Sequence, residues 1–159
     1  MILTALTLLA MQIPPEPMRA TIGRDLINDR IRATATLRQG GNRLVVICEP
    51  GNEDGPRVTF NSRRWLARGH LLSGRRRMTY RFDNHPPRRM FWDIDDRRAT
   101  LTRDVRVNAF LRDLRTARRL VIRVKDMEQR RFDAVFDLHG AGPAVDRVMQ
   151  ACSGAAQAS

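Results

Sequence analysis

The sequence contains almost no lysine and few cysteines and histidines. Lys125 is the only lysine, so all but one of the 29 basic residues are arginine. The three histidines, His70, His85 and His139, lie far apart, and none has a second ligand at the spacing of a metal site. The sequence therefore predicts no metal centre.

Motifs of the common enzyme classes are missing as well: no serine in a nucleophile elbow, no phosphate-binding glycine loop and no Cys-x-x-Cys pair. Asp93, Asp95 and Asp96 would place two carboxylates on one face of a strand, where they could hold a hard cation or serve a hydrolase as acid and base. Four arginines flank these carboxylates: Arg88, Arg89, Arg97 and Arg98. Neutralisation by the guanidinium groups is the favoured role, so we expect no catalytic activity and no cofactor.

The sequence also lacks an apolar run long enough to span a bilayer as a regular helix. The uncharged run Met1–Ile13 precedes a proline-rich segment, 14–17, and is typical of the apolar part of a secretory signal peptide. No lysine or arginine precedes this run and no small-x-small cleavage site follows it, so a loosely packed N-terminus is the alternative. We expect a signal peptide or apolar leader with a Pro-rich linker over 1–19, one β-rich domain over 20–152 and a disordered tail over 153–159.

Only two cysteines are present, Cys48 at the end of an apolar run and Cys152 near the C-terminus. We expect them to form a disulfide that joins the C-terminal segment to a core strand. With the apolar leader, this bond favours a periplasmic or secreted location, because disulfides are rare in cytosolic proteins. The alternative is a cytoplasmic protein with two unrelated buried thiols.

The predicted fold centres on the stretch Asn42–Cys48. Its apolar residues 44–47 are mostly β-branched, and turn signals lie on both sides of it, at 39–42 and 49–51. This pattern predicts a central strand that is buried on both faces.

Other segments alternate apolar and polar residues, which predicts antiparallel strands around the central one. The expected strands or extended segments are 20–29, Arg30–Leu37, Val58–Phe60, Met78–Asp83, Arg88–Ile94, Arg119–Lys125 and a last strand lined by Phe132, Ala134, Phe136 and Leu138. Residues 74–77 are expected to form a loop, and 61–66 fit either a helical turn or a strand.

Two segments have helical spacing instead. Apolar residues recur every three or four positions over 107–118, with Asn108 placed to cap the first turn. Gly140–Pro143 predicts the start of a C-terminal helix whose apolar stripe ends at Cys152. The sequence thus predicts a mainly β protein: an antiparallel β-sandwich-like domain with one short internal helix and a C-terminal helix.

The formal charge of +12 predicts attraction to polyanions such as nucleic acid, anionic lipid or acidic glycan, unless it reflects only a solvated, partly ion-paired surface. Five aromatic residues interleave with arginines as in a base-stacking platform: Trp65, Tyr80, Phe82, Phe91 and Trp92. In the strand from Met78, however, the alternation places the aromatic residues in the core. The candidate polyanion contacts are Arg63, Arg64, Arg75, Arg76, Arg77, Arg88 and Arg89.

An ordered set of short segments resembles a family of small exported bacterial proteins. These segments are Leu44–Cys48, Met78–Asp83, Ala109–Leu111, Arg119–Val124, Phe136–Gly140 and Ala151–Cys152. In this order they are similar to the family that includes the VasI accessory proteins of type VI secretion, and more loosely to invasion-associated-locus-B-like periplasmic proteins. The resemblance implies an antiparallel β-sandwich-like domain, a bond between Cys48 and Cys152 and a periplasmic location, and it carries over no catalytic residue.

Two hypotheses for the function follow. The first is a non-enzymatic exported accessory or interaction protein of the cell envelope, with an unidentified protein partner. The second is an arginine-rich protein that binds nucleic acid in the cytosol. Their salt dependence would separate them, since phosphate contacts weaken steeply as salt rises.

Overall fold

The computed structural model describes residues 15–52, 55–67, 74–102 and 105–155, so the predicted leader over Met1–Ile13 lies outside the described residues. The described chain forms strands β1 (Arg19–Arg24), β2 (Ile31–Gln39), β3 (Asn42–Cys48), β4 (Arg57–Asn61), β5 (Gly74–Phe82), β6 (Arg88–Asp95), β7 (Arg98–Leu101), β8 (Arg119–Lys125) and β9 (Arg131–Asp137), and helices α1 (Val105–Thr116) and α2 (Ala141–Ala155). The prediction of a mainly β protein with an internal and a C-terminal helix is confirmed.

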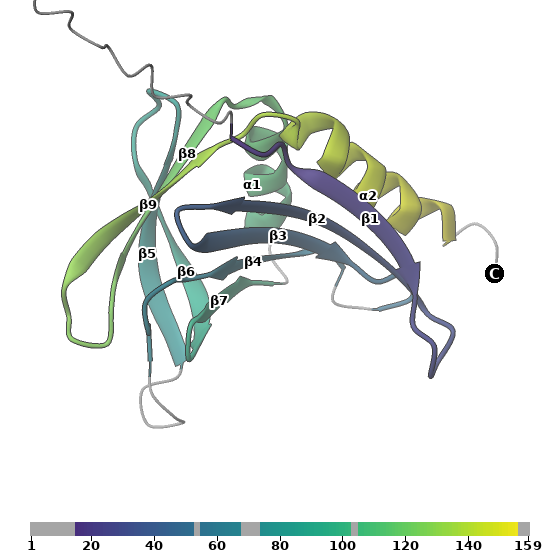
Figure 1. Ribbon diagram of the computed structural model, residues 1–159, viewed down its shortest axis with the longest axis horizontal. Coiled ribbons are helices and arrows are strands. Elements are labelled where there is room, and N and C mark those ends of the chain that lie inside the picture. Colours follow the sequence, from purple (N-terminus) through teal and green to yellow (C-terminus); the bar gives the residue numbers. More distant parts are fainter. Residues whose placement is uncertain (1–14, 53–54, 68–73, 103–104, 156–159) are drawn as a thin grey trace, which may run out of the picture.

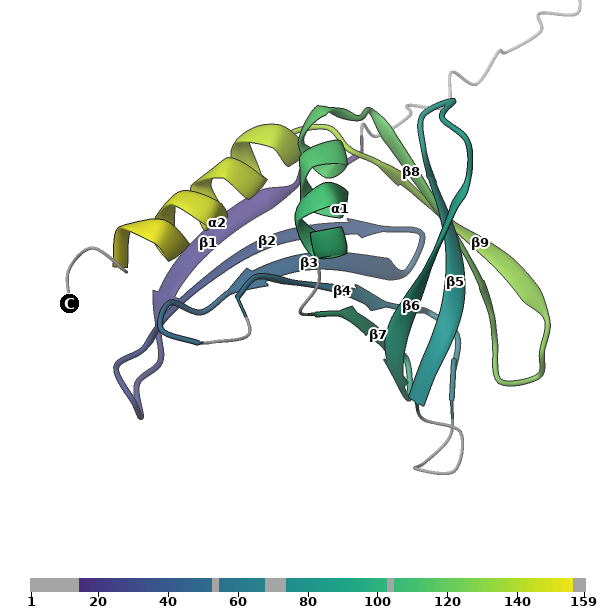
Figure 2. The same cartoon turned by 180° about the vertical axis from the view of Figure 1, so that it is seen from behind.

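The strands form one antiparallel sheet in the order β1-β2-β3-β4-β7-β6-β5-β8-β9. The sheet is strongly curved, and both helices lie on its concave side (Figures 1 and 2). The curvature brings the two halves of the sheet face to face: the rings of Phe60 in β4 and Phe136 in β9 lie 6.2 Å apart, edge to face. Near the ends of β2 and β9, the Asp137 backbone N–H donates to Gln39 Oε1 at 2.6 Å. The inner surfaces of the two halves therefore share one core.

The predicted central strand, Asn42–Cys48, is confirmed with the same bounds as β3. It pairs with β2 on one side and β4 on the other, and all its residues from Leu44 onward are buried. The turn between β2 and β3 contains Gly40 and Gly41, with φ of 57° and 75°. Two consecutive positive φ angles are what a type I′ hairpin turn needs, and glycine adopts them without a steric cost.

The predicted disulfide is also confirmed. Cys48 at the end of β3 is bonded to Cys152 on α2, with 5.9 Å between the two Cα atoms and a sequence separation of 104. Val145 and Val148, on the same stripe of α2, are fully buried against β1, β2 and β3. The C-terminal helix is thus held over the first half of the sheet by both packing and a covalent bond.

Helix α1 fills the concave side of the second half of the sheet. Its residue Phe110 is fully buried and makes edge-to-face contacts with Tyr80, Phe82 and Trp92, with ring centroids 5.1–5.8 Å apart. Tyr80 and Phe82 of β5 are therefore core residues, as the alternation of that strand predicts, and Trp92 of β6 is buried with them.

Five local features differ from what the sequence predicts. Asn108 does not cap α1, because the helix begins earlier, at Val105. Residues 74–77 are not a loop, because they begin β5 and pair with residues 91–94 of β6. Strand β7 was not predicted, and α2 continues past Cys152 to Ala155, into the expected tail. Of the segment 61–66, only Asn61 belongs to a strand, as the last residue of β4, and 62–66 form neither helix nor strand.

The first part of the segment predicted over 20–29 is a strand, since β1 ends at Arg24 and a turn follows. Within the described residues, no helix is long and apolar enough to cross a membrane.

Candidate anion-binding surface

The strands present arginines on the convex side of the sheet, which the helices leave open; we call this side the outer face. Strand alternation explains its composition, because the apolar positions of each strand face the core and the positions between them face outward. The outward-facing cations of the strands are Arg19 of β1, Arg32 and Arg38 of β2, Arg43 of β3, Arg57 of β4, Arg75, Arg77 and Arg81 of β5, Arg89 of β6, Arg98 of β7, Arg119, Arg123 and Lys125 of β8, and Arg131 of β9. The convex side of the sheet is therefore strongly basic.

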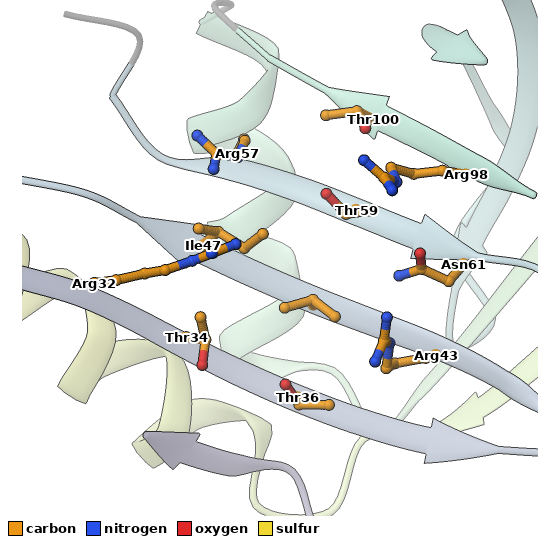
Figure 3. Close-up of a pocket in the computed structure, with 11 residues that line it drawn as sticks. Arg32, Thr34, Thr36, Arg43, Ile47, Arg57, Thr59, Asn61, Arg98 and Thr100 are labelled. Carbon is orange, nitrogen blue, oxygen red and sulfur yellow. The ribbon is translucent and has the colours of Figure 1, made fainter. Parts of the chain in front are cut away.

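A shallow basin of about 340 Å³ lies on the outer face of β2, β3, β4 and β7. Figure 3 shows threonine side chains across its middle, Arg32 and Arg57 at one end, and Arg43 and Arg98 at the other. At the first end both guanidinium groups are paired with Glu49, at 3.3 Å and 3.1 Å. One carboxylate thus offsets half of the charge at that end, while Arg43 and Arg98 at the second end form no ion pair with a described residue.

A larger groove of about 830 Å³ lies where two hairpins separate. β8 pairs with β5 only from Arg123 to Leu120, opposite Thr79–Phe82. Beyond that point the β8–β9 hairpin diverges from the β5–β6 hairpin, which both views in Figures 1 and 2 show. The residues that line the groove are Arg76, Arg77, Thr79, Pro87, Arg89, Arg123, Val124, Lys125, Gln129 and Arg131. Among the described residues, no aspartate or glutamate lines it.

Three of the groove's cations already contact a neighbouring protein group. Arg123 forms two hydrogen bonds of 2.7 Å to the Asp133 carboxylate, and this contact lowers the pKa of Asp133 and raises that of Arg123. Arg76 donates to the Leu66 carbonyl at 2.8 Å, and Arg77 lies 5.0 Å from the centre of the Phe91 ring.

Three further cations in the groove are not paired with a described carboxylate. Arg89, Lys125 and Arg131 form no ion pair within the part of the chain that the structure describes. They are the cations of the groove that remain free to bind an anion.

The structure brings together only some of the seven predicted polyanion contacts. Arg76, Arg77 and Arg89 line the groove, and Arg75 lies beside it, 3.8 Å from the Asp93 carboxylate. The others lie elsewhere: Arg63 follows β4, where its N–H bonds to Asn42, Arg64 pairs with Asp126, and Arg88 pairs with Asp113.

Sequence reasoning missed three cations of the groove, Arg123, Lys125 and Arg131. A signal for the first two was present, because the alternation over Arg119–Lys125 already places them on the outward face of a strand. Nothing local indicated that this strand would lie next to β5.

No family model matches this sequence, and no curated protein or solved structure matches it. The resemblance to the VasI-like family stays a prediction.

The exposed aromatic residues do not form an open stacking platform. Trp65 is 43% exposed and Phe91 39% exposed, but the Arg97 guanidinium lies 4.4 Å from the centre of the Trp65 ring, and Phe91 has Arg75 and Arg77 near its ring. These rings hold arginines in place by cation–π contacts.

Two of the three aspartates singled out in the sequence make contacts with neighbouring segments, Asp93 through its carboxylate and Asp96 through its backbone carbonyl. Asp93 lies closest to Arg75 on the neighbouring strand, not to the arginines beside it in the sequence. The Asp96 carbonyl accepts hydrogen bonds from the backbone N–H groups of Leu66 and Ala67, at 2.8 and 2.9 Å. No cluster of three or more potential metal ligands occurs among the described residues, which do not include His70.

Asp126, at the start of the turn between β8 and β9, gives a prediction about pH. Its buried carboxylate accepts backbone hydrogen bonds from Glu128 and Arg130, and guanidinium hydrogen bonds from Arg130 and Arg64. Burial by itself raises the pKa of Asp126, but these donors outweigh it and hold the pKa below its usual value. Because the pKa is lower in the folded state, the stabilisation is present above about pH 4 and is lost as the pH falls through the folded value.

We therefore expect the unfolding temperature of the wild type to decrease once the pH is lowered past about 4. Asp126→Asn should already be less stable at pH 7, and its unfolding temperature should decrease less over the same pH range. Calorimetry between pH 7 and pH 2 measures both quantities. The exposed Asp93→Asn is the matched control and should follow the wild-type profile. An Asp126→Asn profile parallel to the wild type would contradict the assignment.

Proposed function

We propose that this protein is a non-enzymatic, exported interaction protein of the bacterial cell envelope that binds an anionic partner through the outer face of its sheet. The observation that carries the proposal is the excess of cations on this face: arginines hold most of the charged outward strand positions, against four aspartates on β6 and β9, and the groove has six cations and no carboxylate among its described lining residues. Such a surface attracts anions and raises their rate of association. The helices occupy the opposite side, so the outer face is open to a large partner.

The disulfide supports the exported location. A bond between Cys48 and Cys152 persists in an oxidising compartment and is rare in the cytosol. A periplasmic or secreted protein with a basic face would meet anionic glycans, anionic lipids and acidic proteins. The accessory role that the resemblance to the VasI-like family implies is compatible with this setting.

A salt titration tests the anion-binding part of the proposal. We expect labelled heparin to bind at 50 mM salt and to lose about 40-fold in affinity by 200 mM, as about three charge contacts in the groove would give. Fluorescence anisotropy measures this loss, and a labelled single-stranded oligonucleotide of equal charge is the comparison. Absence of heparin binding at 50 mM salt would overturn the proposal, and binding to the oligonucleotide alone would favour the cytosolic nucleic-acid binder.

Thiol labelling tests the location. When the full chain is made in a bacterial host, both cysteines should resist alkylation until a reductant is added, and the protein should be found outside the cytoplasm. Immediate alkylation of both thiols in protein recovered from the cytoplasm would refute export.

A further inference from the structure

Two cations face each other across the β8–β9 hairpin at the groove. Lys125 and Arg131 are directly opposite in the register, on the outward side of the two strands. Like charges at directly opposite positions destabilise a pair of strands. Neither forms an ion pair with a described acidic residue, so this pair of cations lowers the stability of the fold. A role in binding an anion would explain why both positions are cationic.

A third cation reaches the same groove from the other hairpin. Arg89 of β6 is opposite Thr79 of β5, and Thr79 is in turn opposite Arg123 of β8. Three uncompensated cations thus come from three strands, β6, β8 and β9, around one groove. Its volume of about 830 Å³ falls in the range of small-molecule sites, about 300–1,000 Å³.

We propose that this groove is a binding site for a ligand that carries two or more phosphate groups, held by Arg89, Lys125 and Arg131. The inference rests on the proposed function and names the ligand class of the same basic face. A phosphate group offers two or three non-bridging acceptor oxygens and one or two negative charges, so a ligand with two or more phosphates can bridge donors from different strands. A single carboxylate has two oxygens and one charge, which cannot neutralise three separate cations. Arginine forks also match phosphate oxygens with two parallel hydrogen bonds.

Asp133 limits the charge of the site. Its carboxylate binds both Arg123 Nε and Nη2, so this fourth cation is withheld from a ligand. Replacing Asp133 by asparagine would release Arg123 into the groove. Tighter binding by Asp133→Asn would be specific evidence for the site, because damage to the fold does not produce tighter binding.

The first experiment measures inorganic tripolyphosphate binding by titration calorimetry. We expect Lys125→Glu to weaken binding by about tenfold or more, since a hydrogen bond to a charged group is lost and repulsion is added. The same substitution should raise the thermal midpoint, because the new carboxylate would face Arg131 as an opposite charge. Arg147→Glu, at an exposed position of α2 on the opposite side of the sheet, changes the net charge equally and should leave tripolyphosphate affinity within a factor of about two to three, by long-range charge alone.

The second arm uses Asp133→Asn and vesicles. Asp133→Asn should bind tripolyphosphate several-fold more tightly while its thermal midpoint falls. Sedimentation with vesicles of cardiolipin in phosphatidylcholine, abolished by Lys125→Glu, would identify a lipid headgroup as the source of the phosphates. Tripolyphosphate binding without sedimentation would instead support a soluble phosphorylated ligand.

The outcomes separate this inference from the proposed function. Equal loss in Lys125→Glu and Arg147→Glu would overturn the groove as the site, while heparin binding would still support the proposed function. Heparin binding without tripolyphosphate binding would overturn the ligand class alone. If neither probe binds at 50 mM salt, the inference and the proposed function both fail.

Discussion

Reduction of the disulfide between Cys48 and Cys152 is expected to lower the free energy of unfolding by about 4–5 kcal/mol. The bond closes a loop with a sequence separation of 104, and the chain-entropy model assigns a stabilisation of this size to such a loop. A domain of this length has a net stability of about 5–15 kcal/mol, so the loss is a large part of the total. Reduction should therefore release α2 from the first half of the sheet at denaturant concentrations where the oxidised protein is fully folded.

Urea unfolding with and without a phosphine reductant measures this effect. The double variant Cys48→Ala/Cys152→Ala is the control: it should unfold at the lower urea concentration and show no response to the reductant. Alanine is chosen because Cys48 is fully buried and a serine hydroxyl there would have to be desolvated. Equal unfolding midpoints for the oxidised and reduced wild type would contradict the prediction.

Phe110→Ala is expected to cost about 3–5 kcal/mol. The ring is fully buried and contacts three other aromatic rings, from Tyr80, Phe82 and Trp92, so its removal leaves a cavity at the centre of the second half of the core. Edge-to-face aromatic contacts add to the loss beyond the buried area. The surrounding residues belong to sheet strands that are paired on both sides, which restricts their collapse into the space.

Urea unfolding of Phe110→Ala with the disulfide intact measures this cost. The matched control is Val105→Ala on the same helix, where the side chain is 84% exposed and the expected change is within about 0.5 kcal/mol. A cost below about 1 kcal/mol for Phe110→Ala would show that α1 is not the centre of this core. The two largest predictions therefore address different halves of the sheet.

The position of the helices also explains why the outer face is available. Both α1 and α2 lie on the concave side, so the sheet buries its apolar face there and leaves the arginine-bearing face to solvent (Figure 2). The arginines add no buried charge to the core, because the aliphatic parts of their side chains can lie on the sheet while the guanidinium groups stay hydrated. A basic sheet face is thus compatible with a stable fold.

Much of the fold follows from local sequence patterns. The apolar run from Leu44 to Cys48 and the glycines at 40 and 41 predict β3 and its hairpin, because a two-faced apolar strand and a turn with positive φ each need those residue types. The spacing of Val145, Val148 and Cys152 predicts the buried face of α2. With only two cysteines, one on a core strand and one on that face, the disulfide follows as well.

Long-range pairing decided the rest. Residues 74–77 resemble a loop by themselves, and they form a strand because β6 supplies a partner edge with Phe91 and Trp92. β7 is too short to be recognised alone, and it exists because it fits between β4 and β6.

The groove depends on tertiary structure for the same reason. Alternation along the chain is enough to predict that arginines face outward on several strands, since the side-chain period of a strand is two residues. It does not predict which arginines become neighbours. Sheet order placed β8 beside β5, register set Lys125 opposite Arg131, and the divergence of the two hairpins opened the space between them. The register of Lys125 and Arg131 is set within one hairpin, but the placement of β8 beside β5 and the space between the two hairpins depend on contacts between residues far apart in the chain, which no local pattern contains.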